Sequence, residues 1–237
     1  KKYPISVATG VNTLFNSLNN CKEFQLLAPK TLKATIAGGM ALQEHVAKKF
    51  REITGCIVLE GFGLTEASPV THINPMRLDN PKASIGVPLP STLAMIVDED
   101  GRPLPIGEVG ELIVKGPQVM KGYWKNPEET RRVIKDGWLW TGDIARMDES
   151  GYFFIVDRKK DMILVSGFNV YPNEVEEVIS SHPDVLESAV IGIKGDSGNE
   201  TVKAFVVKKR EGLTLDELQN FCRKQLVAYK VPRKIEF

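Results

Sequence analysis

A carboxylate and a guanidinium stand fifteen residues apart in the segment from Asp136 to Pro172. Asp143 directly follows Gly142, and a glycine lets the backbone come close to a ligand. Arg158 offers a rigid fork of hydrogen-bond donors. Each also has an ordinary explanation, because Asp143 suits a turn and Arg158 suits a solvated charge cluster. For each residue alone the ordinary explanation is favoured, and only the pattern of the whole segment favours a binding site.

A second group of side chains that could bind a ligand lies between Gly61 and Glu66. Phe62 supplies an aromatic face, Thr65 a hydroxyl and Glu66 a carboxylate, all close to the end of a predicted strand. The run is not the dinucleotide-binding fingerprint, because Glu66 occupies the place of the third glycine. The structural alternative is a buried Phe62 followed by two residues that cap a helix.

A strand, helix, strand unit is expected to position this second group. It comprises a strand over Ala34–Ala37, a helix with one apolar stripe, and a strand over Ile57–Glu60. Glycines follow both strands, at Gly38-Gly39 and at Gly61-Phe62-Gly63. Because ligands of parallel sheets bind outside the carboxyl ends of the strands, we expect both glycine turns to face one crevice. The stripe of the helix consists of Leu42, Val46, Phe50 and Ile53.

The segment that carries Asp143 predicts three short strands. These cover Asp143–Met147, Tyr152–Val156 and Met162–Val165. The first two are separated by an ordinary hairpin turn, whereas Arg158–Asp161 places four charged residues before the third. A solvated linker explains these charges better than a tight turn. Ser166–Tyr171 then turns back into another strand.

Prolines punctuate short strands from Ser84 onward and indicate a small antiparallel β subdomain. Its strands are expected over Leu93–Asp98 and Glu108–Lys115. Asn126 opens a short helix with a proline at its first position and acids in its first turn. Near the end of the chain we expect strands over 186–193 and 202–208, joined by the polar turn 195–198.

Three further helices are predicted from periodicity and capping residues. The first covers Gly10–Asn19, with one buried face formed by Val11, Leu14, Phe15 and Leu18. Asn173 and Glu176 resemble the capping box of a second helix, whose apolar face holds Val175, Val178 and Ile179. Thr214 and Glu217 open the last helix, which runs along Leu218, Phe221, Cys222 and Leu226.

The composition is that of an ordinary globular protein. The chain has 237 residues, 42% hydrophobic and 26% charged, enough for one large domain or two small ones. A net charge of +1 argues against nucleic acid as a partner. Three separated cysteines without Cys-x-x-Cys spacing favour a reducing cytoplasm. The three histidines form no metal-ligand cluster, and no apolar run is long enough to span a membrane.

Taken together, the segment from Asp136 to Pro172 and the run Gly61-Phe62-Gly63-Leu64-Thr65-Glu66 resemble those of fatty acyl-CoA synthetases, in the adenylate-forming superfamily. The resemblance extends through nearly all of the chain and implies an α/β fold. It implies the end of a large α/β domain over residues 1–83, a β-barrel-like subdomain over 84–157 and a mobile α+β lid over 158–237. The implied activity is ATP-dependent formation of a long-chain acyl-adenylate, followed by thioester formation with coenzyme A.

The resemblance also implies roles for individual residues in binding ATP. Asp143 and Arg158 would hold the ribose hydroxyls. Phe62, which replaces the tyrosine of the family motif, would stack on adenine, since stacking needs only a ring. Thr65 would bond the α-phosphate, and Glu66 would ligate Mg²⁺.

Other implied roles concern pocket lining, coenzyme A and the hinge. Gly38, Gly39 and Met40 resemble the segment that lines the adenine and acyl pockets, and Gly61 and Gly63 flank the adenine-stacking ring. Ser166 and Gly167 would border the channel for the pantetheine arm of coenzyme A. Lys160 stands at the position of the domain hinge and is counted with Thr65 and Glu66 among the residues that serve catalysis.

The sequence departs from the family pattern at two places. A Ser/Thr/Gly-rich phosphate loop ending in Pro-Lys does not occur in these 237 residues, and the adenylation lysine is expected beyond Phe237. We therefore interpret the chain as a fragment that is inactive alone. An adenylation domain for an aryl or amino acid and a non-catalytic AMP- or CoA-binding module remain as alternatives. Peripheral association with a membrane and formation of a homodimer are compatible with the resemblance.

Overall fold

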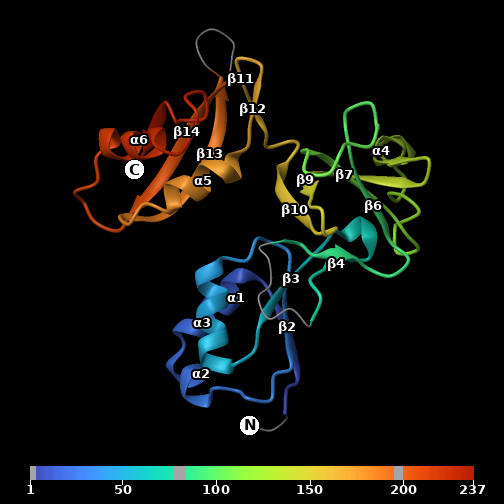
Figure 1. Cartoon of the computed structure of the whole chain (residues 1–237), viewed down its shortest axis with the longest axis horizontal. Helices are drawn as coiled ribbons and strands as arrows, with labels where there is room; N and C mark the ends of the chain where they lie inside the picture. The colour runs from blue at the N-terminus through green and yellow to red at the C-terminus, as the bar shows by residue number, and fades with distance from the viewer. Residues whose placement is uncertain (1–3, 77–83, 195–199) are drawn as a thin grey trace. The chain divides into compact units, whose positions relative to one another are not determined.

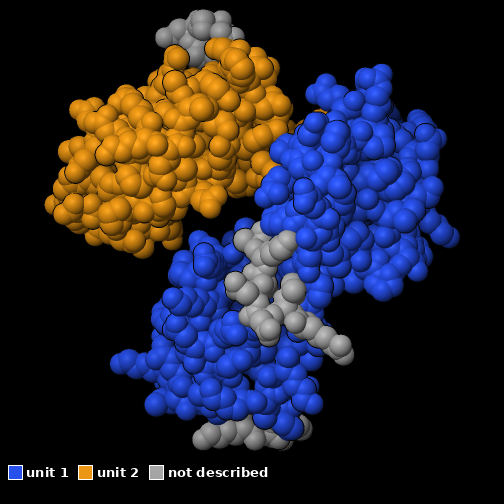
Figure 2. Space-filling view, viewed as in Figure 1, with its two compact units in different colours: residues 1–141, 145–155 blue, residues 142–144, 156–237 orange. Residues whose placement is uncertain are grey.

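The computed structural model describes residues 4–76, 84–194 and 200–237 (Figure 1). The chain divides into two compact units, which Figure 2 shows in different colours. Unit 1 comprises residues 1–141 and 145–155, and unit 2 comprises residues 142–144 and 156–237. The polar turn predicted over residues 195–198 lies outside the described residues. In the described part of the chain, no helix is long and apolar enough to cross a membrane.

A five-stranded sheet with the order β1-β2-β3-β4-β5 begins unit 1. The strands β1 (Val7–Gly10), β2 (Ala34–Ala37) and β3 (Val58–Gly63) are parallel. The strands β4 (Val70–Ile73) and β5 (Val87–Pro88) continue the sheet in antiparallel pairing. The parallel pairing of β2 with β3 confirms the predicted strand, helix, strand unit.

The helices α1 (Asn12–Asn20), α2 (Lys22–Leu27) and α3 (Glu44–Thr54) lie together on one side of β2 and β3 (Figure 1). Phe15 of α1 meets Phe50 of α3 edge to face, with the ring centroids 5.1 Å apart. The buried core between helices and sheet consists of Phe15, Ala37, Val46, Phe50 and Val58. Val46 and Phe50 of the stripe predicted for α3 lie in this core, whereas Leu42 precedes the helix and Ile53 is only half-buried.

The apolar face predicted for the first helix is partly wrong. Val11 and Leu14 are 40% and 45% exposed, whereas Asn12 and Asn19 are buried. The asparagines can be buried because both are hydrogen bonded across the layer. Asn12 exchanges two bonds with Gln43, and the Asn19 amide donates to a backbone carbonyl of α3. Polar groups that find partners thus replace part of the expected apolar stripe.

A second sheet with the order β10-β9-β7-β6 forms the rest of the β-rich region. The antiparallel hairpin of β6 (Leu93–Val97) and β7 (Gly110–Lys115) confirms the two strands predicted there. The strands β9 (Trp138–Met147) and β10 (Phe153–Arg158) complete the order, and β8 (Ile134–Lys135) pairs with β9. The core of this region contains Ala67, Ile85, Ile96, Leu112, Val114, Leu139, Ala145 and Phe153.

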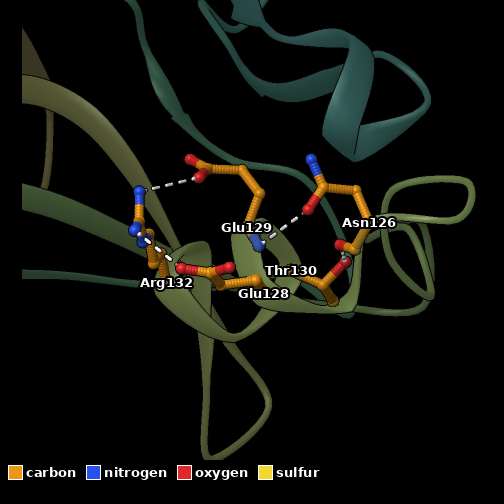
Figure 3. A network of polar contacts seen from close by, with 5 residues as sticks. All are labelled: Asn126, Glu128, Glu129, Thr130 and Arg132. Carbon is orange, nitrogen blue, oxygen red and sulfur yellow. Dashed lines mark hydrogen bonds and ion pairs between the residues drawn. The ribbon is translucent and has the colours of Figure 1, made fainter.

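Helix α4 (Pro127–Val133) begins as the sequence predicts. Asn126 is its N-cap, and the side-chain oxygen accepts a hydrogen bond of 3.1 Å from the backbone N–H of Glu129 (Figure 3). Arg132 pairs with Glu128 and Glu129 on the exposed face of the helix. Such exposed ion pairs contribute little to stability, so the proline and the cap define the start of this helix.

In its described residues, unit 2 holds a hairpin, a three-stranded sheet and two helices. The strands β11 (Ile163–Val165) and β12 (Phe168–Val170) form the hairpin. The sheet pairs β13 (Val185–Lys194) antiparallel with β14 (Glu200–Lys208), and β15 (Lys234–Glu236) parallel to β14. The helices are α5 (Pro172–Ser180) and α6 (Leu215–Arg223). Fully buried residues of its core include Val170, Val175, Ile179, Ala204, Leu218 and Cys222.

Of the two helix starts predicted in this unit, that of α6 is confirmed and the capping box predicted for α5 is wrong. At α6 the Thr214 side chain accepts from the Glu217 backbone and the Glu217 side chain accepts from the Thr214 backbone, as predicted. At α5 the N-cap is Tyr171, without a side-chain cap. Instead, the buried carboxylate of Asp157 accepts from the backbone N–H of Asn173 at 2.9 Å. A carboxylate from β10 therefore caps α5.

The charged segment after β10 differs in part from the predicted linker. Arg158, Lys159, Lys160 and Asp161 are all exposed, which confirms that the run is solvated. The segment is nevertheless a tight turn, because the Asp161 N–H donates to the carbonyl of Arg158 at 3.1 Å. The strand that follows pairs with β12. The charges can therefore occupy a turn because their side chains remain in water.

Candidate functional site

The two glycine segments of unit 1 meet side by side. A Cβ atom on Gly38, directly after β2, would lie 3.3 Å from the carbonyl oxygen of Gly61. The prediction that Gly61, Phe62 and Gly63 form a turn is wrong, because all three belong to β3 and pair with β4. Gly63 has no room for a side chain, since a Cβ atom there would lie 2.0 Å from the carbonyl oxygen of Pro69. These glycines permit close backbone approach inside the sheet.

Phe62 lies on the face of the sheet that carries a buried histidine. Its ring is partly buried, packs against the apolar core of the second sheet, and lies 6.1 Å from the ring of His72. The Nδ1 atom of His72 lies 2.9 Å from the hydroxyl of Thr71, and its Nε2 atom finds no hydrogen-bond partner in the described part of the chain. Burial lowers the pKa of His72 to about 4 and keeps the ring neutral at pH 7.

The hydroxyl and the carboxylate predicted to bind a ligand stand together on the short 3₁₀ helix η1 (Thr65–Ala67). Thr65 is exposed. The Oε1 atom of Glu66 accepts a hydrogen bond of 2.7 Å from the phenol of Tyr123, and this bond is the main reason that the pKa of Tyr123 rises to about 12. The backbone carbonyl of Glu66 accepts from the N–H of Met120 at 2.7 Å. Glu66 is therefore fixed at both its main chain and its side chain.

The surroundings of Glu66 fit one kind of metal site. Within residues 4–76, 84–194 and 200–237, no group of three or more His, Cys, Asp or Glu side chains could hold a metal ion. Mg²⁺ commonly uses one or two carboxylates together with substrate phosphates and water. A single ordered carboxylate such as Glu66 fits that chemistry.

The loop from Gly38 to Gln43 connects β2 to α3 and carries Met40, which is 47% exposed. Two side chains anchor this loop. The Oε1 atom of Glu60 accepts from the N–H of Leu42 at 3.2 Å, and Asn12 accepts from the N–H of Gln43 at 3.1 Å. Burial raises the pKa of Glu60 to about 7, and the bond from Leu42 opposes this shift. The loop is thus held by a carboxyl group that titrates near neutral pH.

Asp143 and Arg158 come together in unit 2, as their predicted common role requires. The Nε atom of Arg158 lies 3.9 Å from an oxygen of Asp143, at the long end of ion-pair distances. The Asp143 side chain is 13% exposed and that of Arg158 is 62% exposed. The backbone N–H of Lys159 donates to the carbonyl of Gly142 at 2.8 Å and ties the two segments together. A largely buried carboxylate and an exposed guanidinium therefore lie close together.

Lys160 lies on the exposed turn after β10. It lines a cavity of about 340 Å³ in unit 2. The acidic residues of the cavity wall are Asp157, Asp161, Glu176 and Glu200. Lys160 is therefore set among carboxylates that lie within its own unit.

Ser166 and Gly167 form the two-residue turn between β11 and β12. Both have positive φ angles, 51° at Ser166 and 85° at Gly167. Two left-handed residues in succession are typical of a type I′ turn, which matches the twist of a tight hairpin. Both residues are exposed, so the tip of the hairpin is available to a ligand.

Three residues of these sites were not expected from the sequence. Glu60 accepts a hydrogen bond from the backbone of Leu42, and Tyr123 donates one to Glu66. Asp157 accepts one from the backbone at the start of α5. The contact between Tyr123 and Glu66 joins residues 57 positions apart, and no local pattern marks such a pair. Only Glu60 had a local signal, because it is an acid at the end of an otherwise apolar strand.

Comparisons with known proteins agree on one family. Residues 1–124 match the model of the AMP-binding enzyme family, and residues 174–237 match that of the AMP-binding enzyme C-terminal domain. The long-chain-fatty-acid–CoA ligase of Escherichia coli O6:H1 is 56% identical over 236 residues. A feruloyl-CoA synthase of an Amycolatopsis species is 37% identical over 236 residues.

These matches cover nearly all of this chain but less than half of each relative. The alignment with the Escherichia coli ligase covers 100% of this chain and 42% of that protein, and the one with the feruloyl-CoA synthase covers 98% and 48%. Among solved structures, ATP-bound MatB from Rhodopseudomonas palustris superposes with a TM-score of 0.88 at 36% identity. That superposition covers 98% of this chain and 46% of MatB.

Proposed function

Because this chain belongs to the AMP-binding enzyme family, we propose that the full-length protein activates a long-chain fatty acid with ATP and transfers it to coenzyme A. The observation that carries the proposal is the 56% identity to a long-chain-fatty-acid–CoA ligase over 236 residues. The chain spans 42% of that relative, so the activity is proposed for the full-length protein.

The first proposed step forms an acyl-adenylate. A carboxylate oxygen of the fatty acid attacks the α-phosphorus of ATP, a new P–O bond forms, and the bond to pyrophosphate breaks. Such a step needs alignment and charge neutralisation more than covalent help from the protein. In the proposal the exposed hydroxyl of Thr65 donates a hydrogen bond to the α-phosphate. The scheme therefore needs no nucleophilic side chain from the protein.

Glu66 is the residue proposed to hold Mg²⁺. When bound with ATP, the ion would neutralise phosphate charge and orient the phosphates. The support is that the Glu66 carboxylate is ordered by Tyr123 and stands next to Thr65 on the same 3₁₀ helix. Glu66 is proposed to bind and orient the ion, and no proton transfer is assigned to it.

Further nucleotide contacts are proposed for residues of each unit considered by itself. On unit 1, Phe62 stacks on adenine, while Gly38, Gly39 and Met40 line the pocket and Gly61 and Gly63 let its wall approach closely. On unit 2, Asp143 and Arg158 bind the ribose hydroxyls. The support for the last pair is their mutual distance of 3.9 Å, with Asp143 only 13% exposed.

The second proposed step transfers the acyl group. The thiol sulfur of coenzyme A attacks the acyl carbon, a C–S bond forms, and AMP leaves with the carboxylate-derived oxygen. Ser166 and Gly167, exposed at the tip of a tight hairpin, are the proposed contact for the pantetheine arm. Lys160 is the proposed hinge between the two steps. The proposed domains are those expected from the sequence, 1–83, 84–157 and 158–237.

An aryl acid is the second candidate substrate, because a feruloyl-CoA synthase is 37% identical to this chain. The lower identity makes it the weaker candidate. A module that binds AMP or coenzyme A without turnover is the non-catalytic alternative. The proposed setting is the cytoplasm, at the membrane surface where long-chain fatty acids partition. The full-length protein is proposed to form a homodimer, which sedimentation can test, and to bind no nucleic acid.

ATP–pyrophosphate exchange in the full-length protein distinguishes these candidates. We expect exchange with palmitate to exceed exchange with ferulate and with amino acids. Higher exchange with ferulate or an amino acid would identify that acid, and not the fatty acid, as the substrate. Nucleotide binding with background exchange for every acid would favour the non-catalytic module.

A further inference from the structure

We infer that Tyr123 is a positioning residue that orders the carboxylate of Glu66 for binding Mg²⁺. The inference rests on the proposed function, in which Glu66 holds the ion that accompanies ATP. Tyr123 itself would touch neither ATP nor the metal. It would act through one hydrogen bond to the carboxylate.

The contact between the two residues is short and is supported by a second one. The phenol of Tyr123 donates to Oε1 of Glu66 at 2.7 Å. Three residues earlier, the N–H of Met120 donates to the backbone carbonyl of Glu66, also at 2.7 Å. One short segment therefore fixes both the main chain and the side chain of Glu66. Rotation of the carboxylate would break the phenol bond.

The backbone of Tyr123 is itself held in place by the start of α4. The backbone N–H of Tyr123 donates to the hydroxyl of Thr130 at 2.9 Å, and that hydroxyl donates to the carbonyl of Asn126 at 2.8 Å. Figure 3 shows Thr130 and Asn126 facing each other at the helix start. Gly122 allows this close packing, because a Cβ atom there would lie 2.7 Å from Cγ2 of Thr130. Tyr123 thus lies beside the capped start of α4 and donates to Glu66 of η1.

This arrangement has a consequence for a cation that binds Glu66. A carboxylate has two oxygens, and a donor that holds one of them sets the direction in which the other points. Carboxylates that bind metals are commonly hydrogen bonded in this way, and loss of such a partner typically costs about 10–100-fold in metal affinity or activity. Phenylalanine at position 123 keeps the ring and removes only the donor. We therefore expect Tyr123→Phe to weaken ATP binding in the presence of Mg²⁺ and to leave ATP binding without the metal unchanged.

Calorimetric titration of the full-length protein can test this role. ATP is titrated with excess Mg²⁺ and again with EDTA, and the ratio of the two affinities measures the benefit from the metal. The variants are Tyr123→Phe, Glu66→Gln and Thr130→Val, which removes the hydroxyl that anchors Tyr123. Tyr229→Phe is the matched control, because it removes a phenol oxygen from the other compact unit.

Tyr123→Phe should lower the metal-dependent ratio about tenfold or more and leave the affinity in EDTA unchanged. Thr130→Val should lower the ratio less, and Tyr229→Phe should not change it. Suppose that the ratio for Tyr123→Phe stays within threefold of wild type while the ratio for Glu66→Gln falls to near one. That result would overturn the inference about Tyr123 and leave the proposed function intact. A wild-type ratio near one would instead overturn the metal-binding role of Glu66 in the proposed function. If Tyr123→Phe does not fold, Thr130→Val decides: an unchanged ratio there overturns the inference.

Discussion

The carboxyl group of Glu60 should make the stability of unit 1 depend on pH. Burial raises its pKa from the ordinary 4.5 to about 7. The folded state therefore favours the protonated acid. The stability from this group is fully present below pH 4.5 and is lost as the pH rises through about 7. The Glu60→Gln variant keeps an oxygen that can accept from Leu42 but has no proton to lose.

The expected size follows from the two pKa values. The difference between 4.5 and about 7 corresponds to roughly 3.5 kcal/mol at about 1.4 kcal/mol per pKa unit. Most of that difference, roughly 2.5 kcal/mol, develops between pH 5 and pH 8 according to the same linkage. Relative to Glu60→Gln, the wild-type chain should therefore lose this amount of unfolding free energy over that range.

Urea unfolding of the chain at pH 5 and pH 8 measures this difference. Tryptophan fluorescence is a suitable signal, because Trp124, Trp138 and Trp140 all lie in the same compact unit as Glu60. The control is Glu149→Gln at an exposed position of a hairpin turn. Parallel pH dependence of the wild type and Glu60→Gln, within about 0.5 kcal/mol, would refute the reasoning. A carboxyl NMR titration that placed the pKa of Glu60 near 4.5 would refute it as well.

Three further substitutions test the site and the fold. In the full-length protein, Asp143→Ala should raise the KM for ATP roughly 10–100-fold, since charge-assisted hydrogen bonds contribute about 1.5–3 kcal/mol; an equal change in the KM for the fatty acid would make Asp143 only a turn residue. Lys160→Pro should spare acyl-adenylate formation and slow transfer to coenzyme A about tenfold or more in single-turnover assays, because proline fixes φ at the proposed hinge; equal losses in both steps would exclude this pivot. Thr214→Ala should lower the unfolding free energy of the chain by about 1 kcal/mol through loss of the α6 cap, and an unchanged urea midpoint would contradict that role.

Local patterns predicted those elements whose signals are local. The strand β2, the helix α3 and the hairpin of β6 and β7 each combine apolar periodicity with turn residues inside one short segment. The cap of α6 likewise lies within four consecutive residues. Such signals depend on neighbouring side chains and backbone preferences, and both are visible in the sequence.

The errors arise where partners are distant. The α1 face was misjudged because Asn12 is satisfied by Gln43, 31 positions away. The short edge strand β1 escaped prediction because its partly exposed positions carry no continuous apolar signal. The glycines of β3 suggested a turn, although pairing with β4 keeps them in the sheet.

The candidate site divides in the same way. The residue types that suit a nucleotide, Thr65, Glu66, Asp143 and Arg158, were evident from motifs. The groups that orient them, Tyr123 among them, could not be found without the fold. Their roles in binding remain predictions for the full-length protein.

The central claim is that the full-length protein joins a long-chain fatty acid to coenzyme A through an acyl-adenylate. A single-turnover reaction with labelled palmitate, ATP and Mg²⁺ tests it most directly, with products separated before and after coenzyme A is added. We predict palmitoyl-adenylate and pyrophosphate in the first stage, and conversion to palmitoyl-CoA and AMP in the second. Bound nucleotide without release of pyrophosphate, or an adenylate that coenzyme A does not consume, would contradict the claim.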